Sequence, residues 1–287
     1  MLTDASFIRR LDSLYLLARK VLNGSLQADR KSTKKGTGIT FADYAEYHLG
    51  ADYRSIDWRV FARFESLVVK LFEVEEDATI YIMLDQSKSM QSKFDYARQL
   101  AAGLGYIALN CLDRLSVYGI GDSLTPILEP CRGRGNVMSL LQGLEDAPTL
   151  DGDTKFNTCS RLFQARHQRK AVIIVISDFL FADGFEDGLS YLNWNKHDVY
   201  CLQVQNEDDT RCSYKGDIEL ACVETGKSRR VTVSPREAAL YEKAVADLNK
   251  RLITACAARQ IGIASTTPEV AFDHVIQDIL RRGGLVA

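Results

Sequence analysis

The sequence predicts a mixed α/β protein built on a doubly wound, mainly parallel sheet with helices on both faces. From Ala78 onward, apolar segments with the length of a buried strand alternate with segments that have the period of a helix, as in consecutive βαβ units. The expected strands are 78–84, 115–120, 171–177 and 198–204. Aspartates follow two of them, Asp85 and Asp178, and ligands of such sheets bind at the carboxyl ends of the strands.

Helices are expected between these strands. Apolar residues from Phe94 to Cys111 recur at steps of three and four, which marks one face of a long helix. Shorter helices are expected at 137–144, 158–168 and 185–194. A hairpin is predicted after them, with strands at 217–223 and 229–233 around a turn at 224–227.

The C-terminal segment contains a clear helix start. Residues 234–237, Ser-Pro-Arg-Glu, combine an N-cap serine with proline at the first helical position and glutamate at the third. This pattern predicts a helix that runs to about residue 259. A short strand at 261–264 and a last helix, beginning in the same way at Thr267-Pro268-Glu269, are expected to follow.

The chain is expected to divide near residue 76. Residues 1–76 are predicted to form an N-terminal helix and a small β-rich subdomain, and residues 77–287 the α/β domain with the hairpin inserted near 215–233. Gly24 is expected to end the first helix; residues 28–38 are polar and basic, as in an exposed loop, and residues 68–72 alternate like a strand. The apolar face of the first helix is marked by Phe7, Leu11, Leu14, Ala18 and Val21.

Composition narrows the class of protein. The 36 basic and 38 acidic side chains nearly balance, so bulk charge does not favour binding to nucleic acid. The seven cysteines are odd in number and contain no Cys-x-x-Cys pair, which is typical of a reduced, cytoplasmic protein. No segment has the length and apolar character of a membrane span, so none is expected.

A set of oxygen ligands is predicted at the carboxyl edge of the sheet. Asp85, Ser87 and Ser89 present one carboxylate and two hydroxyls on a short arc directly after a strand, and hard oxygen atoms are the ligands that Mg²⁺ prefers. Asp178 follows a second apolar strand, and Thr154 precedes a helix. We therefore expect these five residues to hold Mg²⁺, with Mn²⁺ or Ca²⁺ as other candidates. Water or a carboxylate of a partner would complete the coordination.

The same residues also have other interpretations. A lone aspartate at this position could cap a helix or a turn, and isolated hydroxyls often bond to the local backbone. The preceding strand, the following helix and the second aspartate favour a metal site. An enzyme is the main functional alternative, namely a magnesium-dependent phosphatase with Asp85 as nucleophile and with Lys88 or Lys93 and Asp178 holding phosphate and metal. Such enzymes use a second carboxylate two residues later, where this chain has Ser87.

The Asp-x-Ser-x-Ser, Thr and Asp pattern resembles the metal-ion-dependent adhesion site (MIDAS) of von Willebrand factor A (vWA) domains. The upstream segments Gly36–Tyr44 and Tyr47–Arg63, with their Ile-Asp-Trp-Arg-Val-Phe-Ala-Arg run, are similar to the signature of a bacterial family, domain of unknown function 58 (DUF58). The chain departs from it at Ala51, where an acidic residue is expected. The Glu224-Thr225-Gly226 turn and the C-terminal helices also look similar, so the resemblance covers nearly the whole chain.

The resemblance implies that the protein acts together with a partner protein. It implies a vWA or Rossmann-like fold, with Asp85, Ser87 and Ser89 in the first metal-binding loop, Thr154 in the second and Asp178 in the third. It also implies a non-enzymatic adaptor or co-chaperone of a MoxR-type AAA+ ATPase, which captures an acidic residue of its protein partner through the bound Mg²⁺. Longer members of the family often carry membrane helices.

Two further features remain open at the level of sequence. Charged residues crowd around Trp58 and predict either an ion-pair network, which is the favoured interpretation, or a recognition surface: Asp52, Arg54, Asp57, Arg59 and Arg63. The basic segment 30–35 could bind RNA, but it lacks the interleaved aromatic residues typical of such binding.

Overall fold

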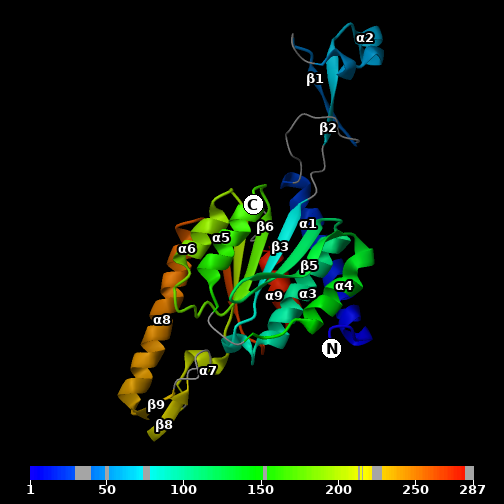
Figure 1. Ribbon diagram of the computed structural model, residues 1–287. Coiled ribbons are helices and arrows are strands. Elements are labelled where there is room, and N and C mark those ends of the chain that lie inside the picture. The colour runs from blue at the N-terminus through cyan, green and yellow to red at the C-terminus, as the bar shows by residue number, and fades with distance from the viewer. Residues whose placement is uncertain are drawn as a thin grey trace. The chain divides into compact units, whose positions relative to one another are not determined.

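The computed structural model describes residues 1–29, 40–48, 52–73, 78–150, 154–212, 214, 216–221 and 228–281. The chain forms two compact units (Figure 1), one comprising Met1–Val21 and Ala78–Ala287 and the other Leu22–Asp77. Several expected features lie outside the described residues: most of the 28–38 loop, Ala51 and the hairpin turn at 224–227.

A six-stranded sheet forms the centre of the larger unit, in the order β10-β7-β6-β3-β4-β5. Its strands are β3 (Thr79–Asp85), β4 (Arg114–Ile120), β5 (Leu124–Arg132), β6 (Val172–Ser177), β7 (Asp198–Val204) and β10 (Gly262–Thr266). All neighbours pair in parallel except β4 and β5. The four predicted strands are confirmed. Strand β5 was not predicted; it contains Pro126 and Pro130 and lies at the sheet edge, where proline is tolerated.

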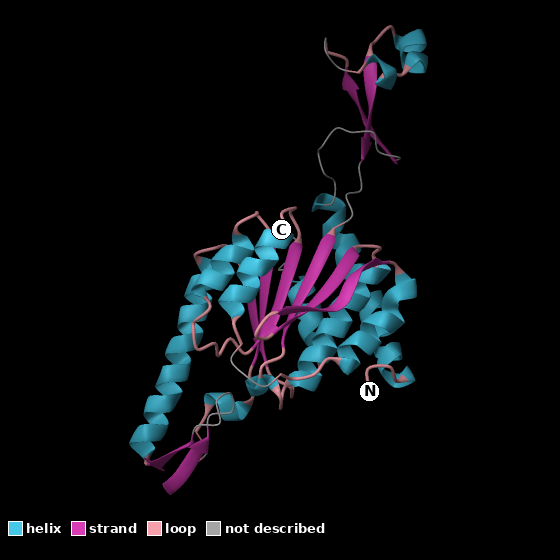
Figure 2. Ribbon diagram, viewed as in Figure 1, coloured by secondary structure: helices cyan, strands magenta, loops and turns pink. Residues whose placement is uncertain are grey.

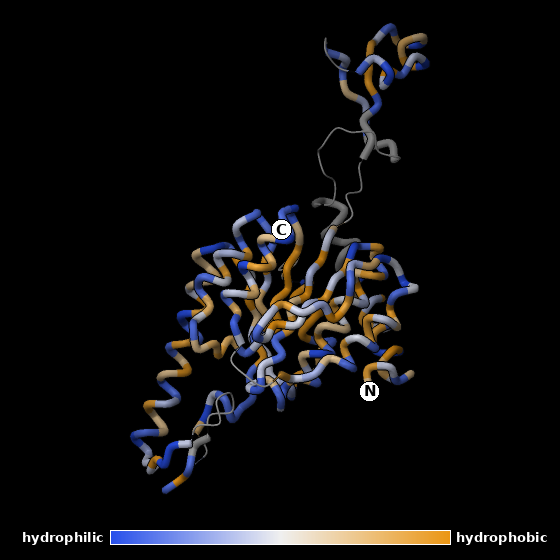
Figure 3. The backbone as a smooth tube through the Cα atoms, in the orientation of Figure 1, coloured by the Kyte–Doolittle hydropathy of each residue, from blue (hydrophilic) through white to orange (hydrophobic). Residues whose placement is uncertain are grey.

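Helices flank this sheet on both faces (Figure 2). They are α1 (Ala5–Asp29), α3 (Phe94–Asn110), α4 (Val137–Asp146), α5 (Phe156–Arg166), α6 (Glu186–Asn193), α7 (Glu207–Thr210), α8 (Pro235–Ala257) and α9 (Phe272–Arg281). Met83 and Val175 of the sheet pack with Phe163 of α5, Leu189 of α6 and Leu252 of α8 in one buried cluster, and the apolar sheet interior is visible in Figure 3. The predicted mixed α/β fold, with a mostly parallel sheet flanked by helices, is confirmed.

Two predicted helix boundaries are wrong. Helix α1 continues past Gly24 to Asp29, because a glycine inside a helix costs only about 1 kcal/mol and does not by itself end it. Helix α9 begins at Phe272 rather than at Thr267, since residues 267–270 form a turn in which the Val270 amide donates to the Thr267 carbonyl. The capping box at Ser234 and Glu237 opens α8 as predicted.

The smaller unit is built on an antiparallel pair, β1 (Thr40–Glu46) and β2 (Val68–Glu73). The 3₁₀ turn η1 (Tyr53–Ser55) and the short helix α2 (Trp58–Phe64) connect these strands. Strand β2 agrees with the strand predicted at 68–72. In the larger unit, the predicted hairpin is present as β8 (Gly216–Ala221) and β9 (Ser228–Val233).

The order of the strands reverses between β3 and β6. From β3 the chain proceeds to β4 and β5 on one side, and then returns to place β6, β7 and β10 on the other. In open α/β sheets, the carboxyl ends of the strands at such a reversal enclose the binding crevice. Asp85 ends β3 and Asp178 directly follows β6, so the topology brings both predicted ligands to this point.

Candidate metal centre

Asp85 is completely buried at the carboxyl end of β3. Its Oδ1 accepts a hydrogen bond of 2.9 Å from the backbone amide of Ser87, and its Oδ2 accepts one of 2.6 Å from the Ser177 hydroxyl. Among the described residues, no cation forms an ion pair with it. Burial and the nearby charge of Asp178 raise the pKa of Asp85 to about 7. The site therefore holds a buried carboxylate without a counter-ion among the described residues.

Ser87 and Ser89 lie directly beside this carboxylate. The strand ends at Asp85, and the chain turns through the 3₁₀ segment η2 (Lys88–Met90), so the two serines come to lie on the same side. Their Oγ atoms are 3.0 Å apart, and Ser87 is only 4% exposed. Three of the five predicted ligands thus converge as expected from their spacing.

Asp178 lies at the same edge of the sheet. Leu84 pairs with Ile176 across β3 and β6, which puts Asp85 and Ser177 at adjacent strand ends with Asp178 one residue beyond. The Oδ1 atom of Asp178 accepts a hydrogen bond from the Leu180 amide at 3.1 Å. The carboxylate is therefore held in place by the turn that follows β6.

Thr154 is half-buried and lies two residues before α5. The Lys155 amide donates to the Gly121 carbonyl, immediately after β4, which anchors this segment at the carboxyl edge of the sheet. Among the described residues, its hydroxyl forms no hydrogen bond. Gly152 and Asp153 lie outside the described residues. The structure thus places Thr154 at the carboxyl edge of the sheet, but no hydrogen bond within the described residues links its hydroxyl to the other four predicted ligands.

Lys93, considered at the level of sequence only as a phosphate ligand of the enzyme alternative, pairs with two carboxylates of this site. This lysine is fully buried, and its Nζ lies 2.9 Å from Oδ2 of Asp178 and 2.7 Å from Oδ2 of Asp209. Burial alone would lower the pKa of Lys93, but the two carboxylates outweigh it and hold the pKa above its ordinary value. An ammonium ion therefore already occupies one side of Asp178.

Asp209 was not predicted as part of this site, although the sequence pattern of a capping box indicates its local conformation. It is the third helical residue of α7, and its carboxylate accepts the Asn206 amide at 2.8 Å in a capping box. Asn206 in turn donates to the Ser92 hydroxyl, next to Lys93. Such capping can be predicted from sequence. The pairing with Lys93 depends on a contact between positions 116 residues apart.

The donor set suits a hard divalent cation. Asp85, Asp178 and Asp209 carry three negative charges when ionised and Lys93 carries one positive charge, so the group retains two negative charges. The described residues contain no cluster of three or more His, Cys, Asp or Glu side chains placed to hold a metal. A cation here would depend on serine and threonine hydroxyls in addition to aspartate, and neutral oxygen donors are acceptable to Mg²⁺.

Fold and site define a class: an α/β protein with buried carboxylates and hydroxyls where its strand order reverses. The sequence profile described as "Protein of unknown function DUF58" matches residues 43–251. This match spans more than half of the chain, and the chain therefore belongs to the DUF58 family.

Curated relatives and solved structures extend the comparison. The uncharacterized proteins Rv1480 of Mycobacterium tuberculosis and Mb1516 of Mycobacterium bovis are each 24% identical over 250 residues, covering 81% of this chain and 75% of theirs. BatB from Bacteroides thetaiotaomicron is similar with a TM-score of 0.42 and 16% identity, covering 71% of this chain and 98% of BatB. An aerotolerance-related membrane protein from Bacteroides fragilis has a TM-score of 0.45 and 15% identity, covering 72% and 98%. In this chain, no helix within the described residues is long and apolar enough to cross a membrane.

Proposed function

We propose that this protein is a metal-dependent protein-binding module of the vWA type, with a MIDAS at the carboxyl edge of its sheet. Asp85, Ser87, Ser89, Thr154 and Asp178 would hold Mg²⁺, or Mn²⁺ or Ca²⁺ in its place. The observation that supports this best is the Asp85 carboxylate. It is 0% exposed, has no counter-ion among the described residues, and lies beside two serine hydroxyls.

The electrostatics of the site favour a cation. A buried carboxylate without a counter-ion is costly in its charged form, and either a proton or a metal ion relieves that cost. Lys93 cannot meet this need, because its ammonium group is already bonded to Asp178 and Asp209. A divalent ion would instead match the two negative charges that remain.

The proposed ligand is an acidic residue of a protein partner. The predicted set contains only two carboxylates among its five oxygen donors, so a bound dication would keep a coordination position for an added carboxylate. From the family resemblance, we propose a MoxR-type AAA+ ATPase as that partner. This chain would serve it in the cytoplasm as a non-enzymatic adaptor or co-chaperone.

The phosphatase alternative receives less support from the geometry. A nucleophilic aspartate must reach its substrate, whereas Asp85 is fully buried and both of its oxygens accept hydrogen bonds. Lys93, one of the two lysines that could hold the phosphate, is also 0% exposed and paired with two aspartates. A carboxylate acting as acid and base is not supplied at position 87, which is serine.

The test is retention of a MoxR-type AAA+ ATPase from the same organism on the immobilised full chain. Retention should require Mg²⁺, should be lost with EDTA and should be lost in Asp85→Ala. The matched control is Asp247→Ala, which removes an exposed carboxylate from α8. Equal retention with and without metal would reject the proposed mechanism. Magnesium-dependent hydrolysis of p-nitrophenyl phosphate that disappears in Asp85→Asn would instead establish the enzyme.

A further inference from the structure

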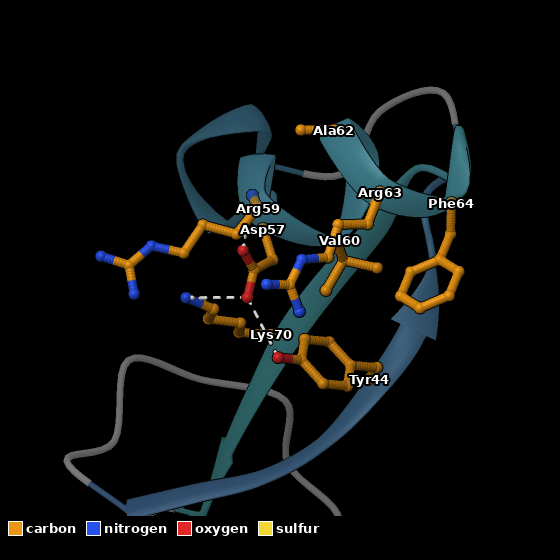
Figure 4. Close-up of a pocket in the computed structure, with 8 residues that line it drawn as sticks. All are labelled: Tyr44, Asp57, Arg59, Val60, Ala62, Arg63, Phe64 and Lys70. Carbon is orange, nitrogen blue, oxygen red and sulfur yellow. Dashed lines mark hydrogen bonds and ion pairs between the residues drawn. The ribbon is translucent and has the colours of Figure 1, made fainter.

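The smaller unit contains an open groove that the metal centre does not involve. It has a volume of about 830 Å³ and is lined by α2 together with one residue from each of β1 and β2. Figure 4 shows these side chains: Tyr44, Asp57, Arg59, Val60, Ala62, Arg63, Phe64 and Lys70. Three of the eight are cationic, and one is anionic.

Asp57, the only carboxylate among the described residues that line the groove, already has hydrogen-bond and ion-pair partners. Asp57 is 6% exposed, and its Oδ2 lies 3.1 Å from Nζ of Lys70 and accepts a 3.0 Å hydrogen bond from the Tyr44 hydroxyl. Its Oδ1 accepts the Arg59 amide at 2.9 Å and so caps α2. The Lys70 ammonium holds the pKa of Asp57 down at about 2, so this carboxylate is ionised at neutral pH and neutralises Lys70.

Two arginines of the groove have no counter-charge among the residues that the structure describes. Arg59 and Arg63 are exposed, and neither side chain forms a hydrogen bond or an ion pair within the described part of the chain. Within the described residues these two arginines take no part in the ion-pair network favoured for this charge cluster at the level of sequence, whereas Asp57 of the same cluster pairs with Lys70. Two guanidinium groups on one short helix leave the groove with a surplus of two positive charges.

Apolar side chains accompany this charge. Phe64 lines the groove beside Tyr44 (Figure 4) and is 72% exposed. Trp58 and Phe61, on the same helix, pack edge to face with ring centroids 6.1 Å apart and are also exposed. Aromatic residues and arginine are the side chains most enriched at protein–protein interfaces.

We propose that this groove binds an acidic segment of a protein partner, in which two carboxylates pair with Arg59 and Arg63 and an apolar side chain covers Phe64. Guanidinium groups bind carboxylates through paired, charge-assisted hydrogen bonds. Nucleic acid fits less well, because two surplus charges are few for a polyanion that is held through many phosphate contacts. The surface is independent of the metal centre, so either proposal can fail without the other.

The test is fluorescence anisotropy with labelled peptides on the full chain. The probe is a Glu-Leu-Glu peptide with glycine flanks, and its counterpart is the Gln-Leu-Gln peptide of the same length. We expect the acidic peptide alone to bind, in EDTA as well as in Mg²⁺, and Arg63→Glu and Arg59→Glu each to weaken binding by about tenfold or more. The matched control is Arg54→Glu, which makes the same charge change in the same unit but outside the groove.

Each other outcome overturns the proposal. Binding that Arg54→Glu weakens as much as Arg63→Glu would show only a general charge effect. Preference for a labelled oligouridylate over the acidic peptide would assign the groove to nucleic acid, and binding of neither probe would remove the surface altogether. Circular dichroism should show unchanged folding of all three variants, because these side chains are exposed and hold no ion pair in the described structure.

Discussion

Asp85 and Asp57 are both largely buried carboxylates, yet their pKa values move in opposite directions. Burial and the charge of Asp178 raise the pKa of Asp85 to about 7, whereas the ammonium group of Lys70 lowers that of Asp57 to about 2. Burial is the largest cause of the shift at Asp85, and the hydrogen bond from Lys70 is the largest cause at Asp57. The two aspartates therefore differ both in the effect of burial on the pKa and in the presence of a counter-ion.

The same comparison explains why the two regions suit different ligands. At this edge of the larger unit, Asp178 and Asp209 share the ammonium ion of Lys93, and Asp85 has no counter-ion among the described residues, so negative charge is in excess. In the groove of the smaller unit, one carboxylate is paired with Lys70 and two guanidinium groups are left over. A metal ion fits the first arrangement and an acidic protein segment fits the second.

The largest effect is expected from removing Lys93, the cation that pairs with Asp178 and Asp209. Lys93→Met would leave Asp178 and Asp209 buried or half-buried without their ammonium partner, and breaking a buried pair costs about 3–5 kcal/mol. The control is Lys170→Met, which breaks an exposed pair with Asp198 and should cost less than about 1 kcal/mol. Urea unfolding followed by circular dichroism measures both. Equal losses would show that Lys93 is not the counter-ion on which this edge depends.

Replacing Asp85 is expected to change the free energy of unfolding by a smaller amount and to raise it rather than lower it. Asp85→Asn removes a buried charge that has no counter-ion in the described structure, so the metal-free variant should be more stable than the native chain by about 1–3 kcal/mol near pH 8. Added Mg²⁺ should raise the melting temperature of the native chain and leave the variant unchanged. A variant that is less stable in EDTA would contradict this account of Asp85, and the same melting curves provide the measurement.

The features that were predicted correctly are those that depend on short, local stretches of the sequence. The strand before Asp85, the helix after it and the second strand before Asp178 follow from apolar periodicity, and parallel strands bring both aspartates to one edge. Ser87 and Ser89 converge because they are two residues apart on one turn. These features depend on short stretches of chain, so they can be read from the sequence.

The rest depended on contacts between distant positions. Lys93 was considered at the level of sequence only as a phosphate ligand in the enzyme alternative, and only the fold shows that it lies between Asp178 and Asp209. The ion pair between Asp57 and Lys70 was likewise not predicted, because it forms only when the start of α2 lies beside β2. Strand β5 was missed for a different reason, since its prolines are compatible with an edge strand only.

A modest pH effect is expected from a half-buried histidine, His167. His167 lies between the hydroxyls of Tyr81 and Tyr118, at 3.0 and 3.2 Å, and burial lowers its pKa. The unfolded chain then takes up a proton at His167 more readily, so the contribution of this residue to stability should fall as the pH drops below about 6.5, by at most about 1 kcal/mol between pH 7 and 5.5. His167→Gln should flatten this dependence in urea titrations. His48→Gln, at an exposed histidine, should leave it unchanged.

The smallest change in stability is expected from replacing Asp57, the aspartate that pairs with a lysine and is compared with Asp85. Asp57→Asn keeps an acceptor for the Arg59 amide and therefore the cap of α2, but it removes the charge that pairs with Lys70. The native pKa of about 2 lies below the unfolded value, so the pair stabilises the unit above about pH 4 and loses its effect as the pH falls through about 2.

The variant should consequently be less stable than the native chain at neutral pH, and the difference should shrink on acidification. Trp58 reports the unfolding of this unit when Trp194, which is 74% exposed, is replaced by phenylalanine, because the chain has only two tryptophans. If Asp57→Asn had no effect at neutral pH, the Lys70 pair would not account for the contrast with Asp85. The neutralisation of Lys70, on which the charge surplus of the groove depends, would then need another origin.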